Sequence, residues 1–101
     1  MTLKEGFKAC RDGNFISHPS FDHTQSMHYF RDSYYYEDGA ILMRHMDWFE
    51  SQEWAKDGWY IKYEASRVDL PLLNALHLLG KAYMFSKRSY EECILKGAIN
   101  G

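Results

Sequence analysis

Two arginines and two tyrosines stand out in "YFRDSYYYEDGAILMRH", residues 29–45. Guanidinium groups bind phosphate through paired hydrogen bonds, and phenol rings offer flat surfaces on which nucleobases stack. Tyr29, Arg31, Tyr35 and Arg44 are therefore candidate ligand-binding residues for a small nucleotide. The alternative is that the same four side chains form the solvated outer face of a sheet.

Imidazole and carboxylate groups gather in "HPSFDHTQSMH", residues 18–28. Such groups are zinc ligands, and His18, Asp22, His23 and His28 would converge if the loop folded back on itself. Their spacing matches no metal motif that we can name, and histidines in loops are ordinarily solvated polar groups. We expect no metal and no cofactor.

Catalytic signatures are missing from the sequence. It contains no G-x-S-x-G, no H-E-x-x-H and no glycine-rich phosphate loop. Asp32 and His45 would face each other across a hairpin as an acid and a base, but such a pair is more often structural. The sequence predicts a binding protein and not an enzyme.

The element that must position the arginines and tyrosines is a β-hairpin. Asp38-Gly39 is typical of a two-residue type I′ turn, and "AILMRH" then forms the returning strand. This register would sort the side chains onto two faces of the hairpin. The face expected to pack on the helices carries Phe30, Tyr34, Tyr36, Ile41 and Met43. The outer face carries Tyr29, Arg31, Ser33, Tyr35 and Arg44, together with Leu42.

A helix is predicted before the hairpin. Thr2 and Glu5 match the T-x-x-E capping box, and Gly13 stands where a helix ends. Leu3, Phe7 and Cys10 share one face of this helix. A short strand is expected over residues 14–17, because Pro19 cannot donate to a sheet ladder, and a loop follows over residues 18–26.

The second half of the chain predicts short helical turns, a last strand and helices. Apolar side chains alternate over residues 59–63, which favours a strand buried on one side. Asp69 suits a helix start before a leucine-rich stretch, and Ser89 with Glu92 repeats the capping-box pattern. We expect an α+β fold with an N-terminal helix, an antiparallel sheet of three to four strands with a central hairpin, and a C-terminal helical pair.

Length and charge restrict the function class. The 101 residues fit one domain, 1–101, with an α+β core over residues 2–63 and a helical extension over residues 69–99. A net charge of −2 gives no overall attraction to nucleic acid or to an anionic membrane. Cys10 and Cys93 form no C-x-x-C pair, and no apolar run reaches the roughly 20 residues of a membrane span. We expect a reduced, cytoplasmic protein.

Three segments carry a likeness to a known family. The leading "LKEGFKACRDGNFISHP", the hairpin and "SQEWAKDGWYIKY" together resemble small phage proteins that include the Thoeris anti-defence proteins and related anti-CRISPR proteins. The likeness covers roughly residues 2–63. Its most specific part is Ser51-Gln52 followed by Asp57 and Trp59, with Gly58 inserted between the last two.

The resemblance implies a function and a site. It implies a phage-encoded protein that sequesters a nucleotide signal in the cytoplasm of an infected bacterium without turning it over. It also implies that Ser51, Gln52, Asp57 and Trp59 shape the rim of the pocket. Because an open face binds a nucleotide weakly, enclosure by a homo-oligomer is expected. The alternative is a stoichiometric inhibitor that binds a bacterial defence protein or host enzyme through aromatic and arginine anchors.

Overall fold

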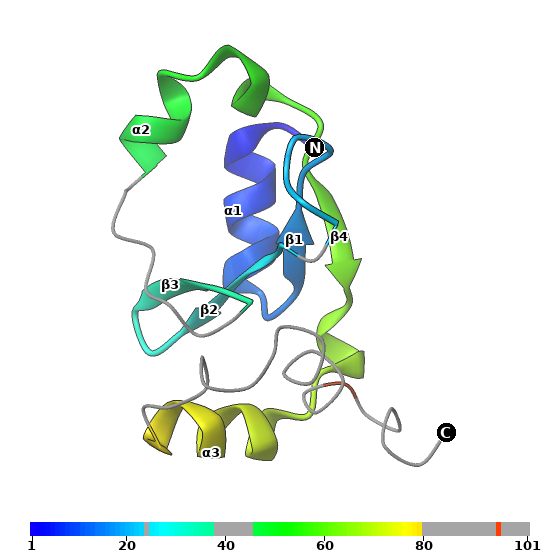
Figure 1. The fold of residues 1–101 in the computed structure, drawn as a ribbon, viewed down its shortest axis with the longest axis vertical. Helices are drawn as coiled ribbons and strands as arrows, with labels where there is room; N and C mark the ends of the chain where they lie inside the picture. Colours follow the sequence, from blue (N-terminus) through cyan, green and yellow to red (C-terminus); the bar gives the residue numbers. More distant parts are fainter. Residues whose placement is uncertain (24, 38–45, 80–94, 96–101) are drawn as a thin grey trace.

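A computed structural model of the chain describes residues 1–23, 25–37, 46–79 and 95, and it has the expected α+β architecture (Figure 1). Four antiparallel strands form one sheet in the order β3-β2-β1-β4. Along the chain the elements are α1 Leu3–Arg11, β1 Phe15–Ser17, β2 Met27–Phe30, β3 Ser33–Tyr36, α2 Met46–Glu50, the 3-10 turn η1 Glu53–Lys56, β4 Tyr60–Tyr63, the 3-10 turn η2 Ala65–Arg67, and α3 Leu70–Leu79.

Helix α1 begins and ends as the sequence predicts. The Thr2 hydroxyl accepts a hydrogen bond from the Glu5 N–H at 3.2 Å, and the Glu5 carboxylate accepts one from the Thr2 N–H at 2.9 Å. Leu3, Phe7 and Cys10 are buried, which confirms the predicted face. Gly13 follows the helix with φ of +102°, a conformation that glycine adopts without steric cost.

Strands β2 and β3 form a hairpin whose turn, at residues 31–32, was not predicted. Strands β2 and β3 are joined by Arg31 and Asp32, with φ of +44° and +69°. Positive φ at both central residues is the geometry of a type I′ hairpin turn, and Asp32 accepts a hydrogen bond from the Tyr29 hydroxyl at 3.3 Å. The prediction of one continuous strand through this point is therefore wrong. The predicted turn at 38–39 and return strand over 40–45 lie outside the described residues.

This earlier turn changes which tyrosines share a face. Tyr29 pairs with Tyr34 and Met27 with Tyr36, and side chains of paired residues point to the same face of the sheet. In one continuous strand, by contrast, Tyr29 and Tyr34 would point to opposite faces. Tyr34 and Tyr36 pack against the core, as predicted. Tyr29 joins them, which corrects its predicted place on the outer face. Phe30, predicted to face the helices beside Tyr34, instead stands on the opposite side with Tyr35.

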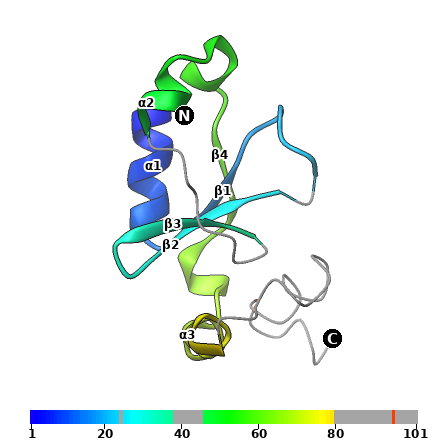
Figure 2. The ribbon, with the colours of Figure 1, turned by 60° about the vertical axis from the view of Figure 1, so that its left-hand side comes forward.

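The main core fills the space between α1, the sheet and the α2–η1 segment (Figure 2). Trp59, which precedes β4, is 1% exposed and contacts Phe7 and Phe49 edge to face at ring distances of 6.1 and 5.6 Å. Its indole N–H donates to the Ala55 carbonyl at 2.8 Å. The core is formed by Leu3, Phe7, Cys10, Ile16, Met27, Phe49, Ala55 and Trp59.

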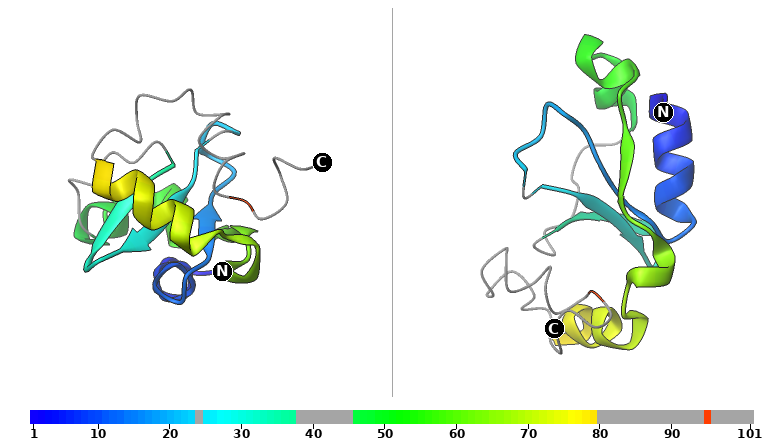
Figure 3. Two further views of the ribbon diagram at one scale, coloured as in Figure 1. Left: turned by 90° about the horizontal axis from the view of Figure 1, so that it is seen from below. Right: turned by 90° about the vertical axis from the view of Figure 1, so that its right-hand side faces the viewer.

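A smaller cluster attaches α3 at one end of the sheet (Figure 3). Leu73 is buried with Phe15 and Val68, and the Asp69 carboxylate accepts a hydrogen bond from the Leu72 N–H, which confirms the predicted helix start. Leu95 forms an isolated antiparallel bridge with Val68, so at this residue the predicted last helix is not found. The rest of that predicted helix lies outside the described residues.

Strand β4 agrees with its prediction in part. The strand is present, and Trp59 before it is buried, but Ile61 is 40% exposed, so the predicted buried side is wrong at this residue. In the described part of the chain, no helix combines the length and apolar character needed to cross a membrane.

The approach of Trp59 to α1 depends on Gly6. A β-carbon at Gly6 would lie 3.0 Å from the Trp59 Cβ, and both residues are buried. Alanine would favour the helix by roughly 0.5–1 kcal/mol, but overpacking costs about 1–3 kcal/mol. We expect Gly6→Ala to lower the free energy of unfolding, measured by urea denaturation, whereas exposed Lys8→Ala on the same helix should change it little. A Gly6→Ala variant as stable as the parent would contradict this packing.

Candidate ligand-binding groove

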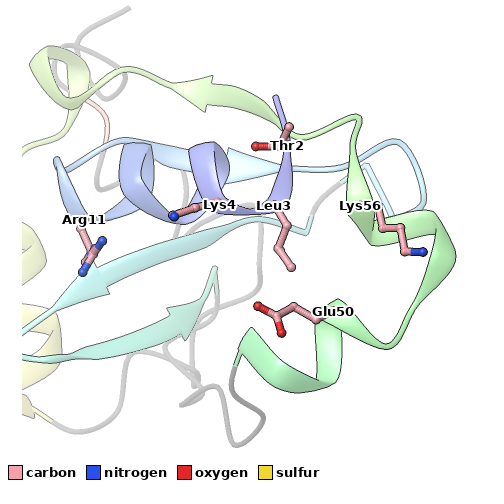
Figure 4. Close-up of a pocket in the computed structure, with 6 residues that line it drawn as sticks. All are labelled: Thr2, Leu3, Lys4, Arg11, Glu50 and Lys56. Atoms are coloured by element: carbon pink, nitrogen blue, oxygen red, sulfur yellow. The ribbon is translucent and has the colours of Figure 1, made fainter.

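A groove of about 490 Å³ lies beside α1 and is closed on one side by α2 and η1 (Figure 4). This volume is within the range of small-molecule sites, which run from about 300 to 1,000 Å³. The residues that line it are Thr2, Leu3, Lys4, Arg11, Glu50 and Lys56.

Cationic groups outnumber acidic groups in the groove. Lys4 and Arg11 are seven residues apart on α1, which places them on the same side of the helix, and Lys56 comes from η1. Glu50 of α2 is the acidic side chain of the lining. Lys56 also contacts Glu53 at 2.7 Å, but this ion pair is exposed and therefore weak, so a ligand can compete for the ammonium group.

One end of the groove approaches the tyrosines of the hairpin. Burial raises the pKa of the Tyr34 phenol, and the nearby Arg11 guanidinium opposes this shift. Tyr29 packs edge to face on Tyr34 with ring centroids 5.1 Å apart. Tyr29 is thus the residue of the predicted aromatic set that lies on the same side of the sheet as α1.

Arg31 and Tyr35 lie on the side of the sheet that α3 covers. The Arg31 guanidinium stands 5.2 Å from the centre of the Phe30 ring, and Tyr35 contacts His77 of α3 at a ring distance of 4.6 Å. Arg44 is outside the described residues. The structure therefore brings Arg31 and Tyr35 to one neighbourhood and Tyr29 to another.

The four residues carried over from the resemblance shape the corner that presents Lys56. Ser51 donates to the Trp48 carbonyl at 2.6 Å, and the Gln52 amide donates to the Ser51 hydroxyl at 3.0 Å. The Asp57 carboxylate accepts from the Gly58 N–H at 2.8 Å, where Gly58 has φ of +97°. Trp59 is buried in the core. Their contacts position the backbone around the groove without placing these side chains in its lining.

His18 has a structural environment. Its Nδ1 accepts from the Ser20 N–H at 3.0 Å, so its Nε2 carries the proton and donates to the Asp57 carbonyl at 2.8 Å. The ring packs edge to face on Trp54 and Trp59 at 5.0 and 5.1 Å. His18 therefore joins the loop of residues 18–26 to the corner before β4.

The other candidate metal ligands point elsewhere. His23 contacts Asp22 at 3.1 Å on the surface, and His28 is buried on the α3 side of the sheet. Across residues 1–23, 25–37, 46–79 and 95, no three histidine, cysteine, aspartate or glutamate side chains converge as a metal site requires.

A histidine pair joins the sheet to α3. The Nε2 atoms of His28 and His77 are 3.0 Å apart, so one ring donates its proton and the other accepts it. Burial, with a contribution from the charge of His77, lowers the pKa of His28 to about 3. Burial and the nearby Arg31 charge lower the pKa of His77. Both shifts favour neutral imidazoles.

Sequence patterns contained part of this arrangement. The i, i+7 spacing of Lys4 and Arg11 could have been identified as one helix side, but nothing local connects either residue with Lys56. His28 and His77 are 49 positions apart and carry no local signal of pairing.

The histidine pair should make the protein less stable in mild acid. Unfolded His28 binds a proton below pH 6.5, whereas the folded residue stays neutral until about pH 3. The unfolded state therefore binds more protons, and stability falls as the pH drops through this window, by about 2 kcal/mol at pH 5 for this residue. Urea denaturation at pH 7.5 and 5.0 measures the loss. In His28→Phe, which retains a ring, the loss should shrink by that amount, and an unchanged loss would refute the assignment.

No protein-family model, curated protein or solved structure matches this chain. The resemblance to phage anti-defence proteins remains a prediction. The function is therefore inferred from the residues themselves.

Proposed function

We propose that this protein binds a small nucleotide in the groove beside α1 and holds it without turnover. The observation that supports this is the set of three cationic side chains, Lys4, Arg11 and Lys56, around one hollow of about 490 Å³. Ammonium and guanidinium groups make charge-assisted hydrogen bonds to phosphate oxygens. Following the resemblance, the role would be sequestration of a defence signal in the cytoplasm of a phage-infected bacterium.

The chemistry of the lining favours binding over catalysis. The Thr2 hydroxyl, which is the alcohol of the groove lining, already accepts the Glu5 N–H in the capping box. A catalytic hydroxyl must be free to reach a substrate, whereas Thr2 is held at the start of α1 by the Glu5 N–H and carboxylate of the capping box. The remaining polar side chains of the lining are the three cations and Glu50.

The expected affinity of a single chain is modest. Three charge-assisted contacts at about 1.5–3 kcal/mol each give roughly 5–9 kcal/mol before costs. Association and ordering cost on the order of 4–15 kcal/mol. Enclosure of the groove by a second copy would exclude water and strengthen the contacts, so a homo-oligomer is part of the proposal.

Calorimetry against cyclic and linear adenine and guanine dinucleotides and cyclic ADP-ribose isomers tests the proposal. Binding should weaken at least tenfold in Arg11→Ala and in Lys4→Ala, because each removes a phosphate partner. Lys8→Ala is the matched control: it removes one positive charge from α1 outside the groove, where Lys8 pairs with Asp12. No heat with any nucleotide, or equal losses in all three variants, would rule out the groove.

A second candidate function is inhibition of a bacterial protein, supported by the edge of the sheet. Strand β4 is an outer strand, and Tyr60 and Ile61 on it are 44% and 40% exposed. An extended segment of another protein can add to such an edge through main-chain hydrogen bonds.

Capture from bacterial lysate distinguishes this second function from the first. A protein partner should co-purify at one copy per chain and be lost in Tyr60→Lys, which places a charge on the edge, while Arg11→Ala should retain it. A protein that sequesters a nucleotide should instead lose nucleotide binding in Arg11→Ala and retain it in Tyr60→Lys. Absence of any stoichiometric partner at several salt concentrations would reject the inhibitor function.

A further inference from the structure

The imidazole of His77 fills a slot on the face of the sheet opposite α1. It stacks on Phe30 with ring centroids 4.1 Å apart and planes 10° from parallel. Tyr35 meets it edge to face at 4.6 Å, and the His28 Nε2 lies 3.0 Å from its Nε2. We call Phe30, Tyr35 and His28 the ring slot, because they surround a flat ring: Phe30 stacks on it, Tyr35 contacts it edge to face, and His28 supplies a polar atom.

The polar atom of the ring slot is held in a fixed position. His28 is 1% exposed, and Phe15 stacks on its other side at 4.5 Å with planes 12° apart. A neutral imidazole nitrogen either donates or accepts a single hydrogen bond. The slot therefore accepts a planar ring that offers one nitrogen at its edge.

A positive charge stands at the rim of the slot. The Arg31 guanidinium lies 5.2 Å from the centre of the Phe30 ring, the same ring that carries His77, and Arg31 is exposed. Charge from Arg31 disfavours a protonated His77. It favours a neutral ring that bears an anionic substituent.

Among the side chains of α3 that the structure describes, contacts to the sheet come from two places, the Leu73 cluster and His77. Leu73 is buried with Phe15 and Val68, but Leu70 and Leu78 are 57% and 69% exposed. Within the described residues, the main core cluster contains no side chain of α3. Elements whose apolar side chains are exposed open at low free-energy cost, and exposed Leu78 lies next to His77, so we expect this end of α3 to leave the sheet while the main core stays packed.

We propose that the ring slot of Phe30, Tyr35 and His28 is a binding site for a planar nitrogen heterocycle of the imidazole or purine type, and that His77 occupies it until such a ring displaces it. The ring stacks on Phe30, its edge nitrogen meets His28, and a phosphate substituent reaches Arg31. This site is on the other face of the sheet from the groove. The ring slot can therefore bind a ligand whether or not the groove does, and the two proposals are tested separately.

Removing the His77 ring tests the proposal. Imidazole, adenosine and AMP should each bind His77→Ala at least tenfold more tightly than the parent by calorimetry, because no side chain has to be displaced. Leu78→Ala is the matched control: it shortens an exposed neighbour on the same helix and should bind as the parent does. Equal affinity of folded His77→Ala and the parent for all three probes overturns the proposal.

A measurement on the parent chain covers the case in which His77→Ala does not fold. With millimolar AMP, the amide hydrogens of residues 70–79 should exchange faster, because the ring has displaced the helix, while those of α1 should keep their rate. In that case, unchanged exchange over residues 70–79 overturns the proposal.

Discussion

The burial of Trp59 against Gly6 is the contact on which the other elements depend. The indole meets α1 where the glycine leaves room, and its N–H fixes the Ala55 carbonyl of η1. His18 and Phe21 pack on the same ring from the loop after β1. One side chain thus joins the helix, the loop and the corner. This contact also sets the geometry of the groove, because it fixes η1 relative to α1. Lys4 and Arg11 lie on α1, and Lys56 lies on η1.

Local signals predicted the parts of the fold that depend on local chemistry. The capping box at Thr2 and Glu5 and the helix end at Gly13 follow from hydrogen bonds and φ values within a few residues. The turn at Arg31-Asp32 did not follow from such a signal, since this pair lacks the glycine or asparagine that marks a type I′ turn. Packing of Tyr29, Tyr34 and Tyr36 on the core, which is a tertiary effect, stabilises this turn.

The ring slot and the groove were predicted less well, because both are completed by residues far apart in the sequence. Arg31 and Tyr35 were identified by residue type, and both lie close to His77. His77 comes from α3, far along the chain, and was not predicted to be near them. Tyr29 was placed on the wrong face by a register that shifted with the turn. Lys56 joins the groove through the fold of the corner, which no pattern within one segment encodes.

The register of the hairpin is determined from both faces at once. Tyr34 packs edge to face on Phe7 at 4.9 Å in the core, while its neighbour Tyr35 contacts His77 on the other side. A slip by one residue would exchange these two tyrosines and break both contacts. Positive φ at Arg31 and Asp32 costs on the order of 1–3 kcal/mol per residue. The chain retains that strain because the alternative register loses the packing on two faces, and this places the Arg31 charge beside the ring slot.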